Sequence, residues 1–280
     1  MIEWWQHIPE QISPIVFTVG FFSVRWYALC WLMGFFISLL CAWYFGKKLG
    51  SPLSKEVLFD LFLVLFLWAF IGGHLGYALL YRPDIFLADP IGFFLPYDTD
   101  TGVWSGISGM SFYGGLTGVI LALFFFVRKR QMDFLSIADL VALSTPPALL
   151  FGRLGNFLTL ELYGRVTTSP FGMYFLDFYG EKTLRHPSAL YEALGEGVFL
   201  FSFLIFVRRF TSVPGRISAW FFMGYGVIRF FLEYVREPDQ GLALVFGILT
   251  RAQIFSLLLV ASGIWLYVWF GSRNHAKIAL

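Results

Sequence analysis

Long apolar runs separated by short polar stretches dominate the chain from residue 26 onward. Because lipid cannot satisfy backbone hydrogen bonds, an apolar run of about 20 residues predicts a membrane-spanning helix. The fourth run is short and contains Pro146 and Pro147, which predict a kink because proline lacks a backbone donor. The seven predicted spans are 26–46, 61–80, 107–127, 137–151, 188–207, 217–235 and 252–271.

Composition agrees with a membrane protein. The 280 residues are 58% hydrophobic and 14% charged, with a mean hydropathy of +0.71, whereas soluble domains carry about 25% charged residues. We therefore predict an all-α polytopic membrane protein of seven transmembrane helices, folded as a single integral-membrane domain over residues 1–280. Loops 82–105 and 158–187 would form an extracytoplasmic cap, and the second is long enough to be a functional lid.

The positions of lysine and arginine predict the orientation, because cytoplasmic loops retain positive charge. Eleven of the 20 basic residues follow the odd-numbered spans, whereas the loop after the second span sets Arg82 among four aspartates. We therefore expect the N-terminus outside and the C-terminus in the cytoplasm. The eleven are Lys47, Lys48, Lys55, Arg128, Lys129, Arg130, Arg208, Arg209, Arg216, Arg273 and Lys277.

The remaining compositional features exclude several classes. Residues 1–25 lack a basic start and predict no cleavable signal peptide; they either lie along the outer membrane interface or form a poorly ordered terminus. Cys30 and Cys41 are about 16 Å apart on one helix, too far for a disulfide, and we interpret them as packing residues. A net charge of +2 without a basic stripe gives no case for nucleic acid.

Polar side chains within the spans gather toward one membrane surface. An ionisable group at a helix centre costs about 2.5–3.5 kcal/mol even on lenient scales, so such residues default to functional hypotheses. Five spans place polar groups in the outer half, while Asp60 and Asp139 lie near the inner ends, and this asymmetry favours a one-sided site over a transport pathway. The outer set is His74, Tyr113, Arg153, Asn156, Glu192, Glu196, Arg229, Glu233 and Arg236.

Several of these residues also have structural interpretations. Arg229 and Glu233 could form an internal ion pair, and Glu196 could pair with Arg229, because a desolvated charge needs a partner. His74 could be a packing histidine and Tyr27 an interfacial aromatic residue. The glycine pairs 72–73 and 114–115 favour close helix contacts over ligand cradles.

Arg153 and Asn156 are harder to explain as structural residues. They lie three residues apart beside Gly152 and Gly155, which predicts a recess that holds a ligand. A planar, permanently charged guanidinium suits phosphate, so Arg153 with Arg229 or Arg236 would clamp an anionic phospholipid headgroup. The chain has no GxSxG, HExxH or P-loop motif and no cysteine or histidine cluster with metal-ligand spacing.

The string GRLGNFLTLELYGR at residues 152–165 resembles the signature of prolipoprotein diacylglyceryl transferase, a family of bacterial inner-membrane enzymes. Other motifs follow the family's order along almost the whole chain. They are VRWYALCWLMG at 24–34, IGGHLGY at 71–77, MSFYGGLTG at 110–118, RHPSALYE at 185–192 and GYGVIRFFLEYVREPD at 224–239.

The resemblance implies a seven-helix enzyme of the inner (plasma) membrane whose active site faces the periplasm and outer leaflet. Such an enzyme transfers the diacylglyceryl group of phosphatidylglycerol to the lipobox cysteine of a prolipoprotein signal peptide and releases glycerol phosphate. This is the first step of bacterial lipoprotein maturation, and it implies no metal and no cofactor. The alternatives are a membrane transporter and a noncatalytic phospholipid-binding protein.

The same resemblance assigns site residues. Arg153 and Arg229 would stabilise the phosphate as charge develops on the leaving group, with Arg236 a weaker candidate for that task. Tyr27 matches the family's important first-span tyrosine. Three further residues, Asn156, Glu161 and Glu233, would hold glycerol hydroxyls or orient the arginines, and Gly164 would permit a tight backbone conformation.

Two positions depart from the family pattern. Tyr113 stands where the family commonly has histidine, and His74 stands where it commonly has arginine. We hypothesise that His74 assists proton transfer while Tyr113 donates a hydrogen bond; the competing hypothesis is that neither is the base that receives the thiol proton. Thr159 and Leu160 replace a small polar pair such as Asn-Gly, which leaves the contacts of that loop open.

Overall fold

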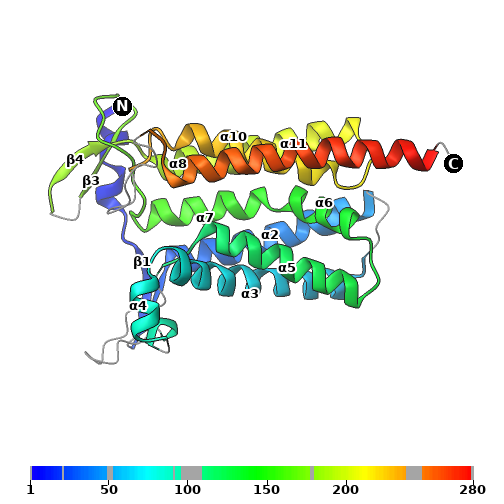
Figure 1. The fold of residues 1–280 in the computed structure, drawn as a ribbon. Coiled ribbons are helices and arrows are strands. Elements are labelled where there is room, and N and C mark those ends of the chain that lie inside the picture. Colours follow the sequence, from blue (N-terminus) through cyan, green and yellow to red (C-terminus); the bar gives the residue numbers. More distant parts are fainter. Residues whose placement is uncertain are drawn as a thin grey trace. The chain divides into compact units, whose positions relative to one another are not determined.

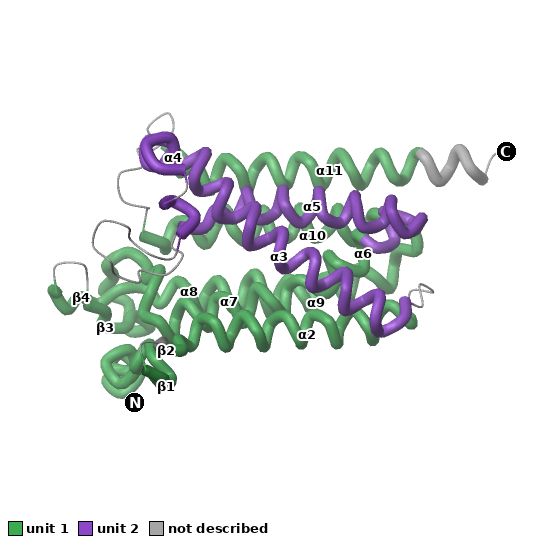
Figure 2. The backbone as a smooth tube through the Cα atoms, turned by 90° about the horizontal axis from the view of Figure 1, so that it is seen from below, with its two compact units in different colours: residues 1–49, 138–280 green, residues 50–137 purple. Residues whose placement is uncertain are grey.

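The computed structural model describes residues 2–20, 22–48, 53–90, 92–95, 109–176, 180–237 and 248–278. The chain forms two compact units, one of residues 1–49 and 138–280 and the other of residues 50–137 (Figure 2). The single integral-membrane domain stays a prediction.

Two helix pairs form most of the first unit. Helix α2 (Trp26–Lys48) packs along α7 (Pro146–Leu158), and α10 (Arg216–Leu232) packs along α11 (Arg251–Ile278) (Figure 1). The predicted kink is confirmed, since α6 (Phe134–Ser144) ends before Thr145 and both prolines open α7. Proline is tolerated there because the first-turn N–H groups have no partner within the helix.

The chain between the two helix pairs is not a regular α-helix. It consists of α8 (Ser188–Glu192), a π-helical segment η3 (Ala193–Phe199), α9 (Leu200–Val207) and the 3₁₀ turn η4 (Arg208–Phe210). A Cβ on Gly197 would lie 2.6 Å from the Leu150 Cβ, so only glycine lets η3 approach α7 this closely. π-Helical segments are rare and occur frequently at functional sites.

Asp139 joins α6 to α10. Its buried carboxylate accepts hydrogen bonds from the Gly215 N–H at 2.7 Å, and from the Ser218 N–H and Oγ at 2.8 Å each. It thus caps the N-terminus of α10, where the helix leaves N–H groups without intrahelical partners. This inner acidic residue therefore has a structural role.

A small head of strands and N-terminal turns completes the first unit. It contains the antiparallel pairs β1 (Ile15–Val19) with β2 (Phe22–Arg25) and β3 (Met173–Leu176) with β4 (Lys182–Arg185). Helix α1 (Ile2–Gln6) and the turn η1 (Ile8–Gln11) pack on β3, where the Trp5 Nε1 donates to the Phe171 carbonyl at 3.1 Å. The N-terminal segment is therefore attached to the predicted 158–187 cap loop.

The second unit is built around one glycine-mediated helix contact. It contains α3 (Lys55–Leu80), α4 (Pro83–Ala88), the turn η2 (Gly92–Phe94) and α5 (Phe112–Lys129). A Cβ on Gly114 would lie 2.2 Å from the Gly72 carbonyl oxygen, and a Cβ on Gly118 the same distance from the Trp68 carbonyl oxygen. The predicted close helix contact at these glycines is confirmed.

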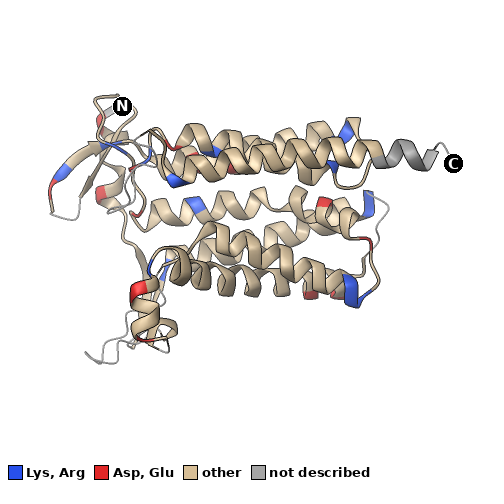
Figure 3. Cartoon of the chain, viewed as in Figure 1, with Lys and Arg blue, Asp and Glu red and all other residues tan. Residues whose placement is uncertain are grey.

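Six helical stretches of the described chain are long and apolar enough to cross a membrane. Most of their charged residues lie toward the helix ends (Figure 3), so the chain is a mostly helical, polytopic membrane protein. Helix α10 covers the sixth predicted span, but its 17 residues rise about 26 Å, less than a hydrocarbon core of about 30 Å. Residues 107–108 of the third predicted span, and residues 91 and 96–105 of the first cap loop, lie outside the described residues.

Candidate functional site

Six ionised side chains meet inside the first unit, three arginines and three glutamates. Arg153 on α7 contacts both acidic residues of the fifth predicted span, with its Nη1 2.9 Å from the Glu192 Oε2 and its Nε 3.0 Å from the Glu196 Oε2. Arg236 reaches the same Glu192 carboxylate, at 2.9 Å from Nη1 to Oε1. Two arginines from different elements therefore share one buried glutamate.

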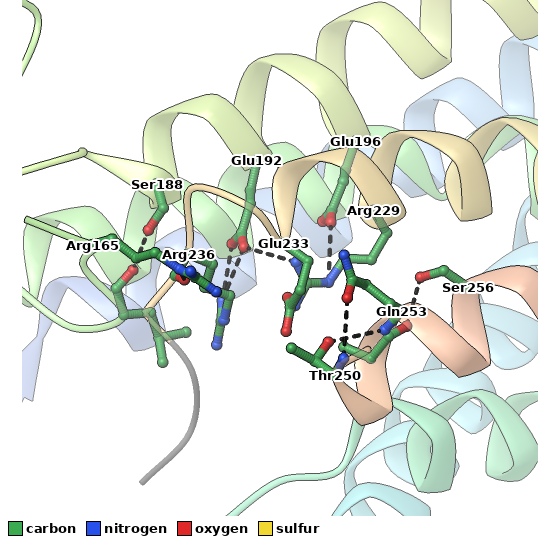
Figure 4. A network of polar contacts seen from close by, with 12 residues as sticks. Arg165, Ser188, Glu192, Glu196, Arg229, Glu233, Arg236, Thr250, Gln253 and Ser256 are labelled. Atoms are coloured by element: carbon green, nitrogen blue, oxygen red, sulfur yellow. Dashed lines mark hydrogen bonds and ion pairs between the residues drawn. The ribbon is translucent and has the colours of Figure 1, made fainter. Parts of the chain in front are cut away.

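Arg229 on α10 completes this cluster. Its Nη1 lies 3.4 Å from the Glu192 Oε1 and its Nη2 lies 2.6 Å from the Glu233 Oε2. Its Nε lies 4.0 Å from the Glu196 Oε1. Figure 4 shows Glu192 and Glu196 projecting from neighbouring turns toward Arg236 and Arg229. The two ion pairs foreseen from the sequence, Arg229 with Glu233 and with Glu196, are confirmed.

The charges of the cluster balance within a buried space. The side chains of Glu192 and Glu196 are at most 1% exposed, and Arg153 is the most exposed member at 16%. Removing a charge from water costs several kcal/mol per ion unless partners compensate. The arrangement therefore holds three guanidinium groups in fixed positions, with each carboxylate serving as their anchor.

A second group of polar side chains extends from Arg153 along the end of α7. Asn156 is buried, and its side chain lies within hydrogen-bonding reach of Tyr27 and Glu161. A Cβ on Gly155 would lie 3.2 Å from the Tyr27 Cα, so Gly155 allows α2 to approach α7 beside this group. Partial burial raises the pKa of the Glu161 carboxyl, and the nearby Arg25 charge opposes that shift.

Gly164 lies between two backbone segments. Its N–H donates to the His186 carbonyl at 2.8 Å, and it pairs with Arg236 in an isolated β-bridge. A Cβ here would lie 2.4 Å from the Val235 carbonyl oxygen and 2.8 Å from the His186 Cβ. The residue thus provides a close backbone approach that sets Arg236 beside the start of α8.

The turn after α7 contains two leucines in the left-handed region. Leu160 has φ +58° and Leu162 has φ +56°, on either side of Glu161. The Glu161 N–H donates to the Asn156 carbonyl at 2.9 Å, which ends the helix in the way that a C-terminal glycine usually does. Each leucine in this conformation costs about 1–2 kcal/mol, and this cost fixes where Glu161 leaves the helix.

The remaining two predicted site residues, His74 and Tyr113, lie in the second unit. The His74 Nδ1 is 3.0 Å from the Gly109 carbonyl oxygen, and its Nε2 is 3.0 Å from the Phe93 carbonyl oxygen. The ring is buried and packs against the Phe93 and Phe94 rings. Tyr113 lies in the first turn of α5, which begins after the capping residue Ser111.

Glu192 and Glu196 are the functional candidates that sequence reasoning did not include among the site residues. Their spacing of four residues and their depth were visible, but a pair of acidic residues on one helix face does not reveal which cations it meets. Only the fold brings three arginines to Glu192. Among the described residues, no group of three or more His, Cys, Asp or Glu side chains is arranged to hold a metal ion; the absence of a cofactor stays a prediction.

Comparison with known proteins gives a consistent match along the chain. The model of a family described as prolipoprotein diacylglyceryl transferase matches residues 14–269. A phosphatidylglycerol–prolipoprotein diacylglyceryl transferase of Chlorobaculum tepidum is 42% identical over 278 residues, which cover 99% of this chain and 95% of the relative. Proteins of the same name from Vibrio cholerae and Vibrio vulnificus are each 43% identical, over 94% of this chain and 93% of each relative.

Proposed function

This chain belongs to the prolipoprotein diacylglyceryl transferase family, and on that basis we propose that it transfers the diacylglyceryl group of phosphatidylglycerol to the lipobox cysteine of a prolipoprotein. The relatives' names supply the two substrates. The observation that carries the proposal is the buried cluster of Arg153, Arg229 and Arg236 around Glu192, because fixed guanidinium groups suit a phosphate that gains charge.

The proposed reaction exchanges one bond for another. The substrate thiol loses its proton, and its sulfur attacks the glyceryl carbon that carries the phosphate. The carbon–oxygen bond to that phosphate breaks as the thioether forms, and glycerol phosphate leaves with the electron pair. Negative charge thus moves from sulfur to phosphate oxygen, which is where preorganised cations lower the barrier most.

The contacts assign different tasks to the three arginines. All three nitrogens of Arg229 lie within 4.0 Å of glutamate oxygens, so this residue is the best suited to holding the cluster together. Arg153 contacts glutamate oxygens through Nε and Nη1, and Arg236 contacts Glu192 through Nη1. We therefore assign Arg153 and Arg236 to the phosphate and Arg229 to their support, which raises Arg236 above its sequence-based rank.

The group beside Arg153 suits the uncharged part of the lipid headgroup. Asn156 and the Glu161 carboxylate would accept hydrogen bonds from glycerol hydroxyls, and Tyr27 would orient Asn156. The Glu233 Oε2 lies 2.6 Å from the Arg229 Nη2. We therefore assign Glu233 to the support of Arg229 and not to the binding of substrate. Gly164 would act through the backbone that positions Arg236, without touching substrate.

The contacts of His74 bear on the proton transfer. A neutral imidazole has one N–H donor and one lone pair, but both ring nitrogens of His74 lie 3.0 Å from carbonyl oxygens. A base needs an open lone pair, so this geometry favours a positioning role for His74 over the acceptor role of the sequence-based hypothesis. Tyr113 stays a candidate hydrogen-bond donor.

The finer topology is part of the same proposal. We place α10 as the sixth of seven spans, with the three residues after Leu232 completing the crossing. The N-terminus would lie in the periplasm and the C-terminus in the cytoplasm of a bacterium, in the inner membrane. The site would then open toward the outer leaflet, and the head of β3 and β4 would meet the signal peptide.

The decisive experiment is a transfer assay with the full-length protein in detergent or vesicles. Phosphatidylglycerol with a labelled glyceryl group and a peptide with a lipobox cysteine should give a labelled peptide and glycerol phosphate in equal amounts. Arg153→Ala should lower the rate by a factor of about 10²–10³, as removal of one oxyanion donor does. Lys48→Gln, which removes an exposed cation at the C-terminal end of α2, should leave the rate unchanged.

The same assay separates the alternatives. Headgroup binding without glycerol phosphate release would identify a noncatalytic lipid-binding protein. Solute flux across vesicles without peptide labelling would identify a transporter. Full activity of Arg153→Ala would show that the arginine cluster does not take part in the reaction, even if the protein is a transferase.

A further inference from the structure

We propose that the second unit holds a binding site for an anionic phospholipid in the groove between α3 and α5, with one acyl chain in the groove and the phosphate at Lys129 and Arg130. This site shares no residue with the arginine cluster of the first unit. The inference is independent of the transferase reaction. It concerns a bound lipid that remains in place.

The groove lies entirely within the second unit. It has a volume of about 370 Å³, within the usual range for ligand sites. Its walls are mostly apolar, and one end carries charge. The lining residues are Asp60, Leu63, Val64, Trp68, Ala122, Phe125, Phe126, Lys129 and Arg130.

The packing of the two helices explains why a groove forms here. Around Gly114 and Gly118 the backbones touch, since a Cβ on either glycine would lie 2.2 Å from a carbonyl oxygen of α3. Beyond Ala122 the next residues of α5 that line the groove are Phe125 and Phe126, which are too large for such close contact. The helices therefore meet at the glycines and leave an apolar furrow toward Asp60.

Both helices of the groove are long and apolar enough to span a membrane, and we place its open side against acyl chains. Phe125 is 61% exposed and Trp68 is 41% exposed. An acyl chain is the occupant whose chemistry matches these walls. A furrow of this kind between membrane helices, ending in basic residues, is the arrangement that binds acidic lipid headgroups in other membrane proteins.

The charged end selects the headgroup. Lys129 and Arg130 follow Arg128 at the C-terminal end of α5, where blue residues gather in Figure 3. The Arg130 Cζ lies 4.7 Å from the centroid of the Phe126 ring, and the Arg130 Nη2 lies 2.6 Å from the Asp60 Oδ2. Asp60 is the single acidic residue among those that line the groove, against two basic ones. The excess positive charge complements a phosphate.

The ion pair between Arg130 and Asp60 allows lipid binding to be changed in both directions. Its side chains are 50% and 37% exposed, and exposed pairs of this kind contribute little to stability. A lipid phosphate would compete with Asp60 for the Arg130 guanidinium. Removing the Asp60 charge should therefore tighten lipid binding, whereas removing the basic residues should weaken it.

Native mass spectrometry of the full-length protein, released from micelles that contain phosphatidylserine or phosphatidylcholine, tests the site. Phosphatidylserine is the probe because it is anionic and is not the proposed diacylglyceryl donor. The double variant Lys129→Gln/Arg130→Gln should weaken phosphatidylserine retention about tenfold or more, because each lipid-facing basic residue adds to the attraction. Asp60→Asn should strengthen it about threefold, with phosphatidylcholine retention unchanged in both.

Two matched variants keep the test sharp. Arg208→Gln/Arg209→Gln removes a basic pair from the end of another helical segment, and it should change retention by less than about twofold if the groove is the site. Val64→Trp fills the groove without changing its charge and should weaken retention as much as the double variant does. Equal losses of phosphatidylserine retention in Lys129→Gln/Arg130→Gln and in Arg208→Gln/Arg209→Gln would show that the lipid is held by diffuse surface charge. Unchanged retention in Val64→Trp would show that no acyl chain enters the groove. Either result overturns the proposal.

Discussion

The two units of this chain hold their helices together by different physical means. In the second unit, glycines on α3 and α5 bring backbones into direct contact, and the one ion pair recorded between the described parts of these helices, Asp60 with Arg130, lies at their exposed end. In the first unit, three arginines and three glutamates lie between α7, η3 and the end of α10, where a bilayer protein would ordinarily place apolar residues.

This difference separates a structural contact from a functional one. Glycine contacts need no desolvated charge, and small residues at helix interfaces are the common solution in membranes. A buried ionic cluster is a costly way to join helices, because replacing it with apolar residues is often neutral or stabilising. Among the described residues such a cluster occurs in the first unit alone, and we propose that its charges serve chemistry, with packing as a secondary result.

The largest predicted effect comes from removing the charge of Glu192, which contacts all three arginines of the cluster. Glu192→Gln leaves three arginines with two glutamates, and an uncompensated buried charge costs about 3–5 kcal/mol. We expect the transfer rate to fall about 100-fold and the protein to unfold more readily in mixed micelles. The control is Glu237→Gln, which removes an exposed partner of Arg185 and should change either quantity little. Equal effects of both variants would contradict the central role of Glu192.

Disrupting the glycine contact between α3 and α5 should cost somewhat less stability. Gly114→Ala places a Cβ 2.2 Å from the Gly72 carbonyl oxygen, and overpacking of this kind costs about 1–3 kcal/mol. Gly115→Ala, one position along, would place its Cβ 3.2 Å from the Ala69 carbonyl oxygen. A shift of a few tenths of an ångström relieves that contact, and alanine favours helix, so this variant should lose clearly less stability than Gly114→Ala. Unfolding followed by tryptophan fluorescence compares the two. Similar stabilities would show that the contact at Gly114 is not tight.

The third prediction concerns the segments that His74 holds to α3. His74→Ala removes the ring whose nitrogens lie 3.0 Å from two carbonyl oxygens, and at least one of these oxygens then lacks a donor, at about 1–3 kcal/mol for a buried unsatisfied group. We expect amide hydrogen exchange of residues 92–95 and 109–111 to accelerate more than tenfold. Arginine offers five donors, so His74→Arg should preserve much of the protection. The exposed His7 serves as control, and an equal acceleration in His7→Ala would point to a global loss of stability.

The smallest predicted effect lies in the strained turn after α7. Leu162 has φ +56° and is 38% exposed, so Leu162→Gly relieves strain while losing little packing. We expect the free energy of unfolding to rise by less than about 1 kcal/mol. Leu160 has a similar φ but packs against the core of Phe157 and Met173, so Leu160→Gly should show no gain. A loss in Leu162→Gly would show that its side chain has contacts that matter.

Much of the candidate site was predictable from the sequence because charge inside a membrane span is conspicuous. Arg153, Asn156, Arg229 and Glu233 stood out for this reason, and the structure places all of them in one unit. Eight of the ten predicted site residues lie there. His74 and Tyr113 lie in the other unit. The sequence distinguished them only by their departure from the family pattern, which does not indicate the unit to which a residue belongs.

The partners of these residues were not predictable. A spacing of four residues puts Glu192 and Glu196 on one face, and both do contact Arg153. The spacing reveals neither the change to a π-helix at Ala193 nor the other cations that the two carboxylates meet. The contacts of His74 with Phe93 and Gly109 join positions 19 and 35 residues away, through carbonyl groups that every residue carries. Backbone acceptors leave no mark in a sequence.

Residue types along the chain were enough to identify which segments are apolar enough to enter a membrane, where prolines divide α6 from α7, and which polar residues require an explanation. These properties depend on residue type and short-range spacing, which are local. The packing of the folded chain, in contrast, was needed to show that Glu192 meets three arginines, that Asp139 caps α10, and that Gly164 sets Arg236 beside α8. Each of these depends on helices that are distant in the chain, and electrostatic pairing is specific only once the partners are within a few ångströms.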